Sequence, residues 1–353
     1  MKNVVSTVSR RFFLTAGAGA LAAPLGIRAS AAAAKSNSLT FTGYGGSYQE
    51  QLTRLAINPF TEETGIKVNV VPAPDLARVK AQLLTGNVEW DVFDGNSAQM
   101  ASGSKLGFWE KLDLSGVDVG DLAVSPTSDA VVWGAYGSGF IWDPKKFSDG
   151  KHPATCAEFF DVKKFPGRRS LRTGAFGNLE AALLADGVLP KDMYPLDLNR
   201  AFRALDRLKP SIAVWATTNP QSISLVQTGE VDFASSFANR VKATTEPGGG
   251  VPLAFSFEQN LLDSEGLAVL KGAPNKENAM KFIAYLLRPE VQARMDNEMG
   301  SVPVSKKAQS MLGPEIRKWQ VDLNNPKSLY LDAGYWADHR EAVEQRFKEW
   351  ILS

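Results

Sequence analysis

Three glycines separate an alternating apolar segment from an amphipathic segment in the stretch LTFTGYGGSYQE, residues 39–50. When a strand ends in glycines just before a helix, backbone N–H groups at the helix N-terminus are free to bind a polar or anionic group. The candidate ligand-binding residues in this turn are Tyr44, Gly45, Gly46, Ser47 and Tyr48. The alternative is that the glycines only permit a tight turn and that Ser47 only caps the helix. This stretch by itself leaves both interpretations open.

The same design recurs at three later strand ends. The segments WDVFDGNSAQ, VWATTNPQ and FASSFANR each place an aromatic residue, a hydroxyl or an amide where a predicted strand meets a predicted helix. They supply the candidate ligand-binding residues Asn96, Ser97, Trp215, Thr217, Thr218, Phe237, Asn239 and Arg240. Several such ends across both halves of the chain predict a pocket of polar groups between aromatic walls. The alternatives are ordinary turn and cap chemistry, a core position for Trp215 and a solvated position for Arg240.

Residue patterns that indicate catalysis or metal binding are scarce. The two histidines, His152 and His339, have no second His or Cys at metal-ligand spacing. The chain has no G-x-S-x-G elbow, and its opening glycine turn completes neither a P-loop nor G-x-G-x-x-G. We therefore assign no catalytic residue, no metal ligand and no cofactor. Cys156 is the only cysteine, so it cannot form an internal disulfide and is expected to be a small, partly buried residue.

Strands and helices must position these residues. Short apolar runs alternate with helical patterns along the chain, which predicts an α/β architecture with largely parallel sheets. Ser47 and Glu50 are predicted to form an S-x-x-E capping box, and one long helix is predicted from Lys276 towards Met299. Two α/β series followed by a returning strand predict two lobes with a cleft between them. Strands are predicted near residues 39–42, 66–70, 90–94, 131–142, 170–173, 212–215, 231–237 and 266–270.

The composition is that of an ordinary globular protein. The chain has 353 residues, of which 44% are hydrophobic, and a formal net charge of +1. Residues 1–34 contain four basic residues and no acid, so their removal leaves a charge of −3. Neither charge creates a field strong enough to gather nucleic acid or an anionic membrane. We therefore expect no nucleic-acid partner and a monomeric protein.

Residues 1–34 are typical of an export signal. The run SRRFFL places Arg10 and Arg11 before an apolar stretch, residues 12–27, and small residues follow in ASAAAA. This stretch is too short and too rich in glycine to span a bilayer, which needs about 20 apolar residues. The arginine pair matches the twin-arginine export signature. We expect cleavage within residues 31–35 and a periplasmic mature protein.

Four segments carry a resemblance to a known family. They are NPFTEETGIKV (58–68), YPLDLNRAFRALDRLKP (194–210), TGEVDF (228–233) and GAPNKENAMKFIAYLLRPEVQ (272–292). With these segments, nearly the whole mature chain resembles the periplasmic solute-binding proteins of ABC transporters, in the group that includes spermidine- and putrescine-binding proteins. The resemblance implies a two-lobed fold whose hinge of crossing strands closes on a small solute. It also implies a membrane permease as partner, and lobes of residues 35–141 plus 265–312 and 142–264 plus 313–353.

The resemblance also implies roles for particular residues. An aromatic residue at the first strand end of such proteins falls on Tyr44 or Tyr48, and a tryptophan-containing segment falls on residues 237–239. An acidic residue before the returning strand falls on Glu265, and the start of the last helix contributes Trp336. Glu265 facing solvent and Trp336 in the core are the alternatives.

One departure from the polyamine-binding members bears on the ligand. Those members carry acids at a strand end of the second lobe, where this chain has the neutral TGAFGN, residues 173–178. Arg240 adds a positive charge near the expected cleft, with Arg172 close by, and a guanidinium suits a carboxylate.

We therefore expect a non-enzymatic, exported solute-binding protein for a small polar metabolite and favour a ligand that bears a carboxylate. A polyamine such as putrescine or spermidine is the alternative. An exported hydrolase or transferase that uses Glu265 is a remote one, and turnover assays would separate it from a binding protein.

Overall fold

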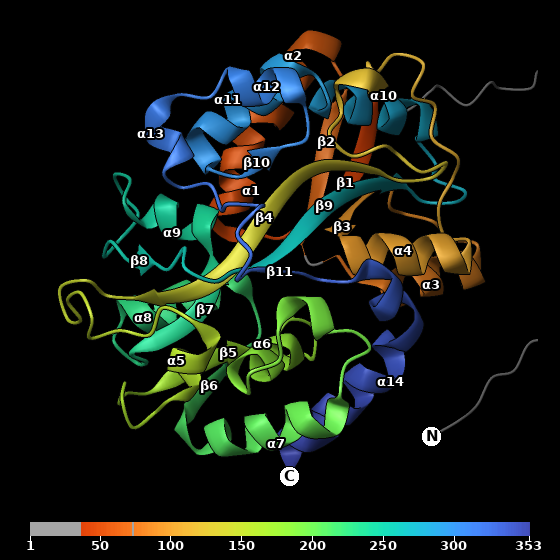
Figure 1. Cartoon of the computed structure of the whole chain (residues 1–353). Coiled ribbons are helices and arrows are strands. Elements are labelled where there is room, and N and C mark those ends of the chain that lie inside the picture. Colours follow the sequence, from red (N-terminus) through yellow and green to blue (C-terminus); the bar gives the residue numbers. More distant parts are fainter. Residues whose placement is uncertain (1–36, 73) are drawn as a thin grey trace, which may run out of the picture. The chain divides into compact units, whose positions relative to one another are not determined.

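Two long strands that cross the middle of one mixed sheet organise the fold. The computed structural model describes residues 37–72 and 74–353, so the predicted export signal lies outside the described residues. Within them the sheet runs in the order β2-β1-β3-β9-β4-β7-β5-β6, and the short strands β8, β10 and β11 pair with β4 or β9. Figure 1 shows the crossing strands between the two groups of helices.

The first lobe is built on three parallel strands, β1 (Ser38–Gly43), β2 (Lys67–Pro72) and β3 (Val92–Asn96). Alternating apolar residues form these strands, and Leu39, Phe41, Val92 and Phe93 are fully buried. Helices with an apolar face cover both sides of the strands. These helical elements are α1 (Gly46–Leu52), the π-helix η1 (Thr53–Ile57), α2 (Asn58–Thr64), α3 (Leu76–Thr85), α4 (Ser97–Leu106) and η2 (Val119–Asp121).

The second lobe repeats this plan with β5 (Arg169–Arg172), β6 (Ile212–Ala216) and β7 (Phe233–Phe237), again parallel. The short strand β8 (Ala254–Phe255) pairs with β4. Its helical elements are α5 (Cys156–Phe160), α6 (Asn178–Ala185), η3 (Pro190–Asp192), α7 (Leu198–Leu208), η4 (Lys209–Ser211), α8 (Asn219–Gln227) and α9 (Ala238–Thr244).

The crossing strands are β4 (Val131–Trp142) and β9 (Leu261–Val269), and they pair antiparallel with each other. β9 also pairs with β3 of the first lobe, from Val92↔Val269 to Asn96↔Glu265. The far end of β4, residues 138–141, pairs with β7 of the second lobe. Because both strands are shared, the strand ends of the two lobes face the same central region. The prediction of parallel sheets holds within each lobe and fails at these crossing strands, since they run against their neighbours.

The last quarter of the chain returns to both lobes. α10 (Lys276–Leu286) and α11 (Pro289–Met299) pack on the core of the first lobe, with Phe282 against Phe41 and Phe60. α14 (Ala333–Leu352) packs on the second lobe, where Phe347 lies against Phe202 and Trp215. Between them lie β10 (Val302–Pro303), α12 (Lys306–Ser310), α13 (Pro314–Arg317) and β11 (Leu329–Tyr330).

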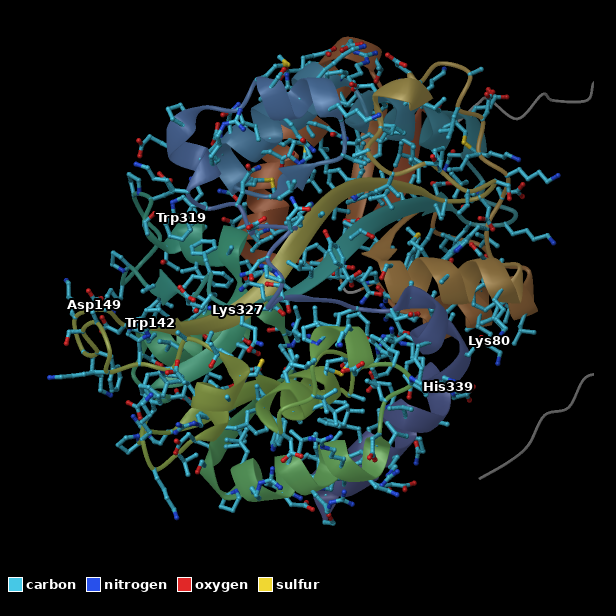
Figure 2. All side chains as sticks on the ribbon, viewed as in Figure 1. Lys80, Trp142, Asp149, Trp319, Lys327 and His339 are labelled. Carbon is cyan, nitrogen blue, oxygen red and sulfur yellow. The ribbon has the colours of Figure 1, made fainter. Side chains whose placement is uncertain are left out.

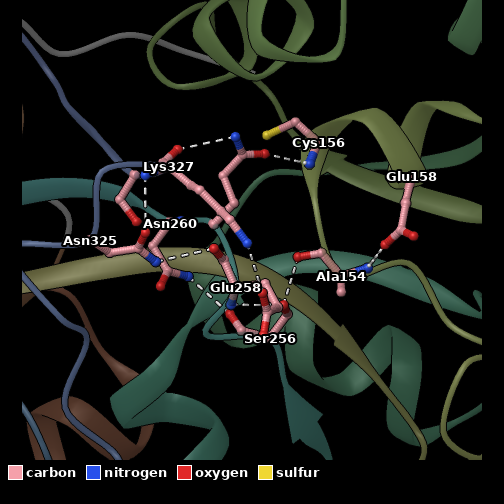
Figure 3. A network of polar contacts seen from close by, with 10 residues as sticks. Ala154, Cys156, Glu158, Ser256, Glu258, Asn260, Asn325 and Lys327 are labelled. Carbon is pink, nitrogen blue, oxygen red and sulfur yellow. Dashed lines mark hydrogen bonds and ion pairs between the residues drawn. The ribbon is translucent and has the colours of Figure 1, made fainter. Parts of the chain in front are cut away.

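A polar network ties the segment before β9 to the segment before β11 (Figure 3). The Gln259 side chain donates to the carbonyl of Lys327 at 3.1 Å and accepts from the backbone N–H of Cys156 at 2.9 Å. The backbone N–H of Asn260 donates to Ser328 Oγ at 3.0 Å. Cys156 is buried, as expected, and burial raises the pKa of its thiol to about 12. The network fixes the point at which the chain re-enters the second lobe.

Both histidines pack against aromatic rings. His152 stacks on Trp142 with ring centroids 3.6 Å apart, and His339 on α14 packs against Tyr335 at 4.5 Å. Figure 2 labels Trp142 and His339 on separate elements. Residues 37–72 and 74–353 contain no group of three side chains arranged to hold a metal ion. In the same residues, no helix combines the length and apolar character needed to cross a membrane.

Two predicted helix features are wrong. Helix α1 begins at Gly46 with Gly45 as its N-cap and without a side-chain cap, so Ser47 lies in the first turn and forms no capping box. The reason is that Gly45 and Gly46 adopt positive φ angles, and the helix starts two residues earlier than a Ser47 cap requires. The long helix predicted from Lys276 is two helices, because Arg288 before Pro289 is extended and ends α10.

Candidate functional site

A cavity of about 580 Å³ lies where the strand ends of the two lobes face each other. The β1–α1 turn, the end of β3 and the crossing strands line it from the first lobe. From the second lobe it is lined by the β5–α6 turn, the β6–α8 turn and the β7–α9 turn. These are the positions at which open α/β sheets bind ligands.

The structure brings ten of the fifteen sequence-predicted site residues to this cavity. They are Tyr44, Gly45, Tyr48, Asn96, Thr217, Thr218, Phe237, Asn239, Arg240 and Glu265. Two of them also cap helices, since Asn96 Oδ1 accepts from Gln99 N–H and Thr218 Oγ1 accepts from Gln221 N–H. The cap chemistry and the cavity position therefore coexist at these strand ends.

The other five predicted residues, Gly46, Ser47, Ser97, Trp215 and Trp336, do not line the cavity. Trp215 packs edge-on against Phe347 and Trp350 in the core of the second lobe. Trp336 is fully buried, and its indole N–H donates to Glu180 Oε1 at 2.6 Å. Both tryptophans are thus core aromatics, the alternative that the sequence left open.

Three carboxyl groups gather where β3 pairs with the crossing strands, and two of them, Asp263 and Glu265, line the cavity. Asp94 is fully buried and accepts from Tyr48 Oη at 3.2 Å and from Trp133 Nε1 at 3.1 Å. Asp263 is buried and accepts from Tyr136 Oη at 3.1 Å. Glu265 lines the cavity, and its Oε1 atom is enclosed without a hydrogen-bond partner. We call Asp94, Asp263 and Glu265 the acidic cluster.

Burial is the main influence on the protonation of the acidic cluster. It raises the pKa of Asp94 to about 7 and that of Asp263 to about 6. Burial, and then the nearby charge of Asp94, raise the pKa of Glu265 well above its ordinary value. At neutral pH the cluster therefore holds protons that a bound cation would displace.

A cationic pair, Arg240 and Arg172, lines the same cavity. Arg240 is only 4% exposed, its Nη1 donates to the carbonyl of Gly45 at 3.3 Å, and its guanidinium lies 5.7 Å from the Tyr48 ring centre. Arg172 lines the same cavity, and its buried Nε has no hydrogen-bond partner. Burial, with a smaller effect from the charge of Arg172, lowers the pKa of Arg240 to about 10.

Neither guanidinium of this pair forms a salt bridge within the part of the chain that the structure describes. A buried cation without a counter-charge is unfavourable unless a ligand supplies one. The cavity can therefore bind an anionic group beside Arg240 and Arg172 and a cationic group beside the acidic cluster.

Sequence reasoning missed several residues of the cavity wall. Trp133 was not a candidate; it belongs to the core of the first lobe, also lines the cavity and donates to Asp94. Tyr136 and Asp263 belong to the crossing strands, which carried no motif, and Asn178 lines the cavity from the start of α6. One available signal was Asp94 itself, an acid inside the apolar strand WDVFD, since buried acids are rare without a function.

Comparison with known proteins identifies the chain. A model of the family described as bacterial extracellular solute-binding protein matches residues 56–322. The chain belongs to this family. It is a solute-binding protein of an ABC transporter with the two-lobed fold that the sequence predicted. The cavity between the lobes is accordingly its candidate solute site.

Three relatives illustrate the range of the solute-binding family. The chain is 33% identical to the gamma-aminobutyric acid-binding protein of Pseudomonas aeruginosa, over 91% of this chain and 93% of that protein. It is 25% identical to the spermidine/putrescine-binding periplasmic protein of Escherichia coli, over 96% of each. The solved periplasmic binding protein AgtB of A. tumefaciens R10, in complex with agropinic acid, has a TM-score of 0.82 at 32% identity, with 90% of this chain and 99% of that chain covered.

A contact between the lobes gives a test of the closed form of this solute-binding protein. A Cβ at Gly46 would lie 2.7 Å from Pro220 Cγ on α8, whereas a Cβ at Gly45 would meet nothing within 4 Å. Both glycines have positive φ, 61° and 67°, so alanine at either position loses about 1–2 kcal/mol of stability. Only the Gly46→Ala side chain would also overlap Pro220, and this overpacking weakens the contact between the lobes by about 1–3 kcal/mol.

We expect Gly46→Ala to bind solute more weakly than its matched control, Gly45→Ala. We also expect the two variants to have similar free energies of unfolding in urea. Calorimetry of the two variants measures the difference. Equal affinities would contradict a role for the Gly46–Pro220 contact in the solute-bound form.

Proposed function

We propose that this protein captures a small metabolite that carries both a carboxylate and an ammonium group. The observation that carries the proposal is the buried Arg240, without a salt bridge, in the same cavity as the acidic cluster. A carboxylate of the solute supplies the counter-charge for Arg240 and Arg172. Its ammonium group lies beside Glu265 and Asp263. The relative named for gamma-aminobutyric acid, which has both groups, supports this class of solute.

A polyamine is the second candidate, because other relatives are named for spermidine and putrescine. The acidic cluster favours it, since a diamine needs carboxylates. Against it, a second amine would lie near Arg240 and Arg172, and the β5–α6 turn contributes no acid of its own. Like charges at that distance oppose binding.

A thermal-shift comparison tests the proposed class of solute. A solute present at 100 times its Kd stabilises the native protein by about 2.7 kcal/mol. We expect amino acids with separated amine and carboxylate groups, such as 4-aminobutyrate, to raise the melting temperature more than putrescine or spermidine. Stabilisation by the polyamines alone would contradict the proposal.

Closure of the lobes on the solute and delivery to a membrane permease complete the proposed role. We propose lobes of residues 35–141 plus 265–312 and 142–264 plus 313–353, and a monomer that binds no nucleic acid and catalyses no reaction. The relatives named as binding proteins support the absence of catalysis. Small-angle scattering should show a smaller radius of gyration with solute, since hinge closure brings the lobes together.

We also propose that residues 1–34 direct the protein through the twin-arginine pathway to the periplasm and are then removed. The periplasmic relatives support the location, and the pair Arg10 and Arg11 supports the pathway. Replacing both arginines by lysine should reduce the periplasmic yield, whereas undiminished export would indicate the general secretory route.

A further inference from the structure

Helix α14 contributes a third cationic side chain to the cavity. Arg340 and Glu344, one turn apart on α14, both line it, together with Leu331 just before the helix. Arg340 is partly buried, and its Nη1 atom is enclosed without a hydrogen-bond partner. It also forms no salt bridge with the residues that the structure describes. Its charge is therefore available to a ligand.

Of the acids near Arg340 on α14, Glu341 is exposed, and Glu344 and Asp338 have other partners. Glu344 Oε2 accepts a hydrogen bond from the backbone N–H of Ala175 at 3.0 Å, which holds it against the β5–α6 turn. Asp338 forms a salt bridge with Lys105 of α4. The helix thus presents to the cavity a cation without a hydrogen-bond partner, together with Glu344, which is held by the β5–α6 turn.

Arg340 and Arg240 come from opposite ends of the cavity. Arg240 belongs to α9, which contacts the first lobe at the β1–α1 turn through Gly45. Arg340 belongs to α14, which contacts the first lobe at α4 through Lys105. Figure 1 shows α9 and α14 on either side of the crossing strands, and these strands carry Asp263 and Glu265. The cavity therefore has a cation towards each end and acids on the strands that pass between them.

This order of charges specifies a solute. We propose that Arg340 binds a second anionic group, so that the preferred solute is an amine with a carboxylate on each side of the nitrogen. The inference rests on the proposed function, because it keeps the first carboxylate at Arg240 and the ammonium at the acidic cluster. The volume of about 580 Å³ fits it, since cavities of roughly 300–1,000 Å³ hold ligands much larger than a four-carbon amino acid.

Three matched compounds test the inference. 4-Aminobutyrate carries one carboxylate, and N-(2-carboxyethyl)-4-aminobutyrate adds a second through the nitrogen. N-(2-carbamoylethyl)-4-aminobutyrate replaces that second carboxylate by a neutral amide of the same shape. We expect the wild-type protein to bind the dicarboxylate about ten-fold or more tightly than the amide, as measured by calorimetry, because the second carboxylate gains a charge-assisted hydrogen bond.

Arg340→Gln is expected to abolish the preference for the dicarboxylate over the amide. Arg346→Gln is the matched control on α14, since Arg346 contacts Asn199 and Phe202 outside the cavity, and it should keep the preference. A wild-type protein that binds 4-aminobutyrate but does not prefer the dicarboxylate overturns this inference alone. So does an Arg340→Gln variant that retains the preference. A wild-type protein that binds none of the three compounds overturns both this inference and the proposed function.

Discussion

Replacing Arg240 by alanine is expected to weaken the binding of 4-aminobutyrate by about 2–5 kcal/mol, the usual loss when one partner of a buried charge pair is removed. The physical reason is that Arg240 is 4% exposed and forms no salt bridge among the described residues. The carboxylate of the solute would lose its main counter-charge beside a largely buried position. Calorimetry of the purified variant measures the loss.

Two further variants make the Arg240 result specific. Arg240→Lys keeps the charge but cannot bind a carboxylate in the planar, bidentate geometry of a guanidinium, so an intermediate loss of affinity is expected. Glu265→Gln should cost less than Arg240→Ala, since Asp94 and Asp263 still provide negative charge beside the ammonium group. A large loss at Glu265 with none at Arg240 would contradict a carboxylate ligand and favour a polyamine.

The affinity for an ammonium-bearing solute is expected to rise with pH. Asp94 has a pKa of about 7 because it is buried, so below that pH it is largely protonated and a bound ammonium group must displace the proton. Displacing one proton lowers affinity by up to about ten-fold for each pH unit below 7. Arg240, with a pKa of about 10, keeps its charge through this range. Affinity should therefore climb from pH 5 to 7 and level off above pH 8.

Calorimetry in buffers of different ionisation enthalpy measures the released proton directly. The Asp94→Asn variant should bind 4-aminobutyrate more weakly at pH 8 and lose most of the pH dependence above pH 6. What remains belongs to Asp263, with its pKa of about 6, and to Glu265, whose pKa burial raises well above its ordinary value. A variant with the same pH profile as the wild-type protein would exclude Asp94 as the titrating group.

The strand ends could be read from the sequence because glycines, hydroxyls and amides cluster where a buried strand meets a helix. Tyr44, Tyr48, Phe237 and Arg240 reach the cavity for this reason. The boundaries of β4 were also predicted, since apolar and aromatic residues, interrupted only by small ones, extend from residue 131 to residue 142.

Other parts of the site depend on contacts that no local pattern reveals. Trp215 follows the same strand-end pattern as Phe237, yet it faces α14 and packs on Phe347. Trp215, a candidate site residue, therefore lies in the core, whereas Trp133, which was not a candidate, lines the cavity. The sequence pattern of the last helix gives Arg340 a position on its polar face. Only the packing of α14 against the second lobe brings Arg340 to the cavity.

Calorimetry with three four-carbon compounds tests the central claim most directly. 4-Aminobutyrate has one ammonium and one carboxylate group, putrescine has two ammonium groups and succinate has two carboxylates. The presence of Arg240 and Arg172 in the same cavity as Asp263 and Glu265 predicts that 4-aminobutyrate binds tightest of the three. Each of the others should be weaker by about 2 kcal/mol or more, since each places one charge beside a like charge. Tighter binding of putrescine than of 4-aminobutyrate would contradict the account.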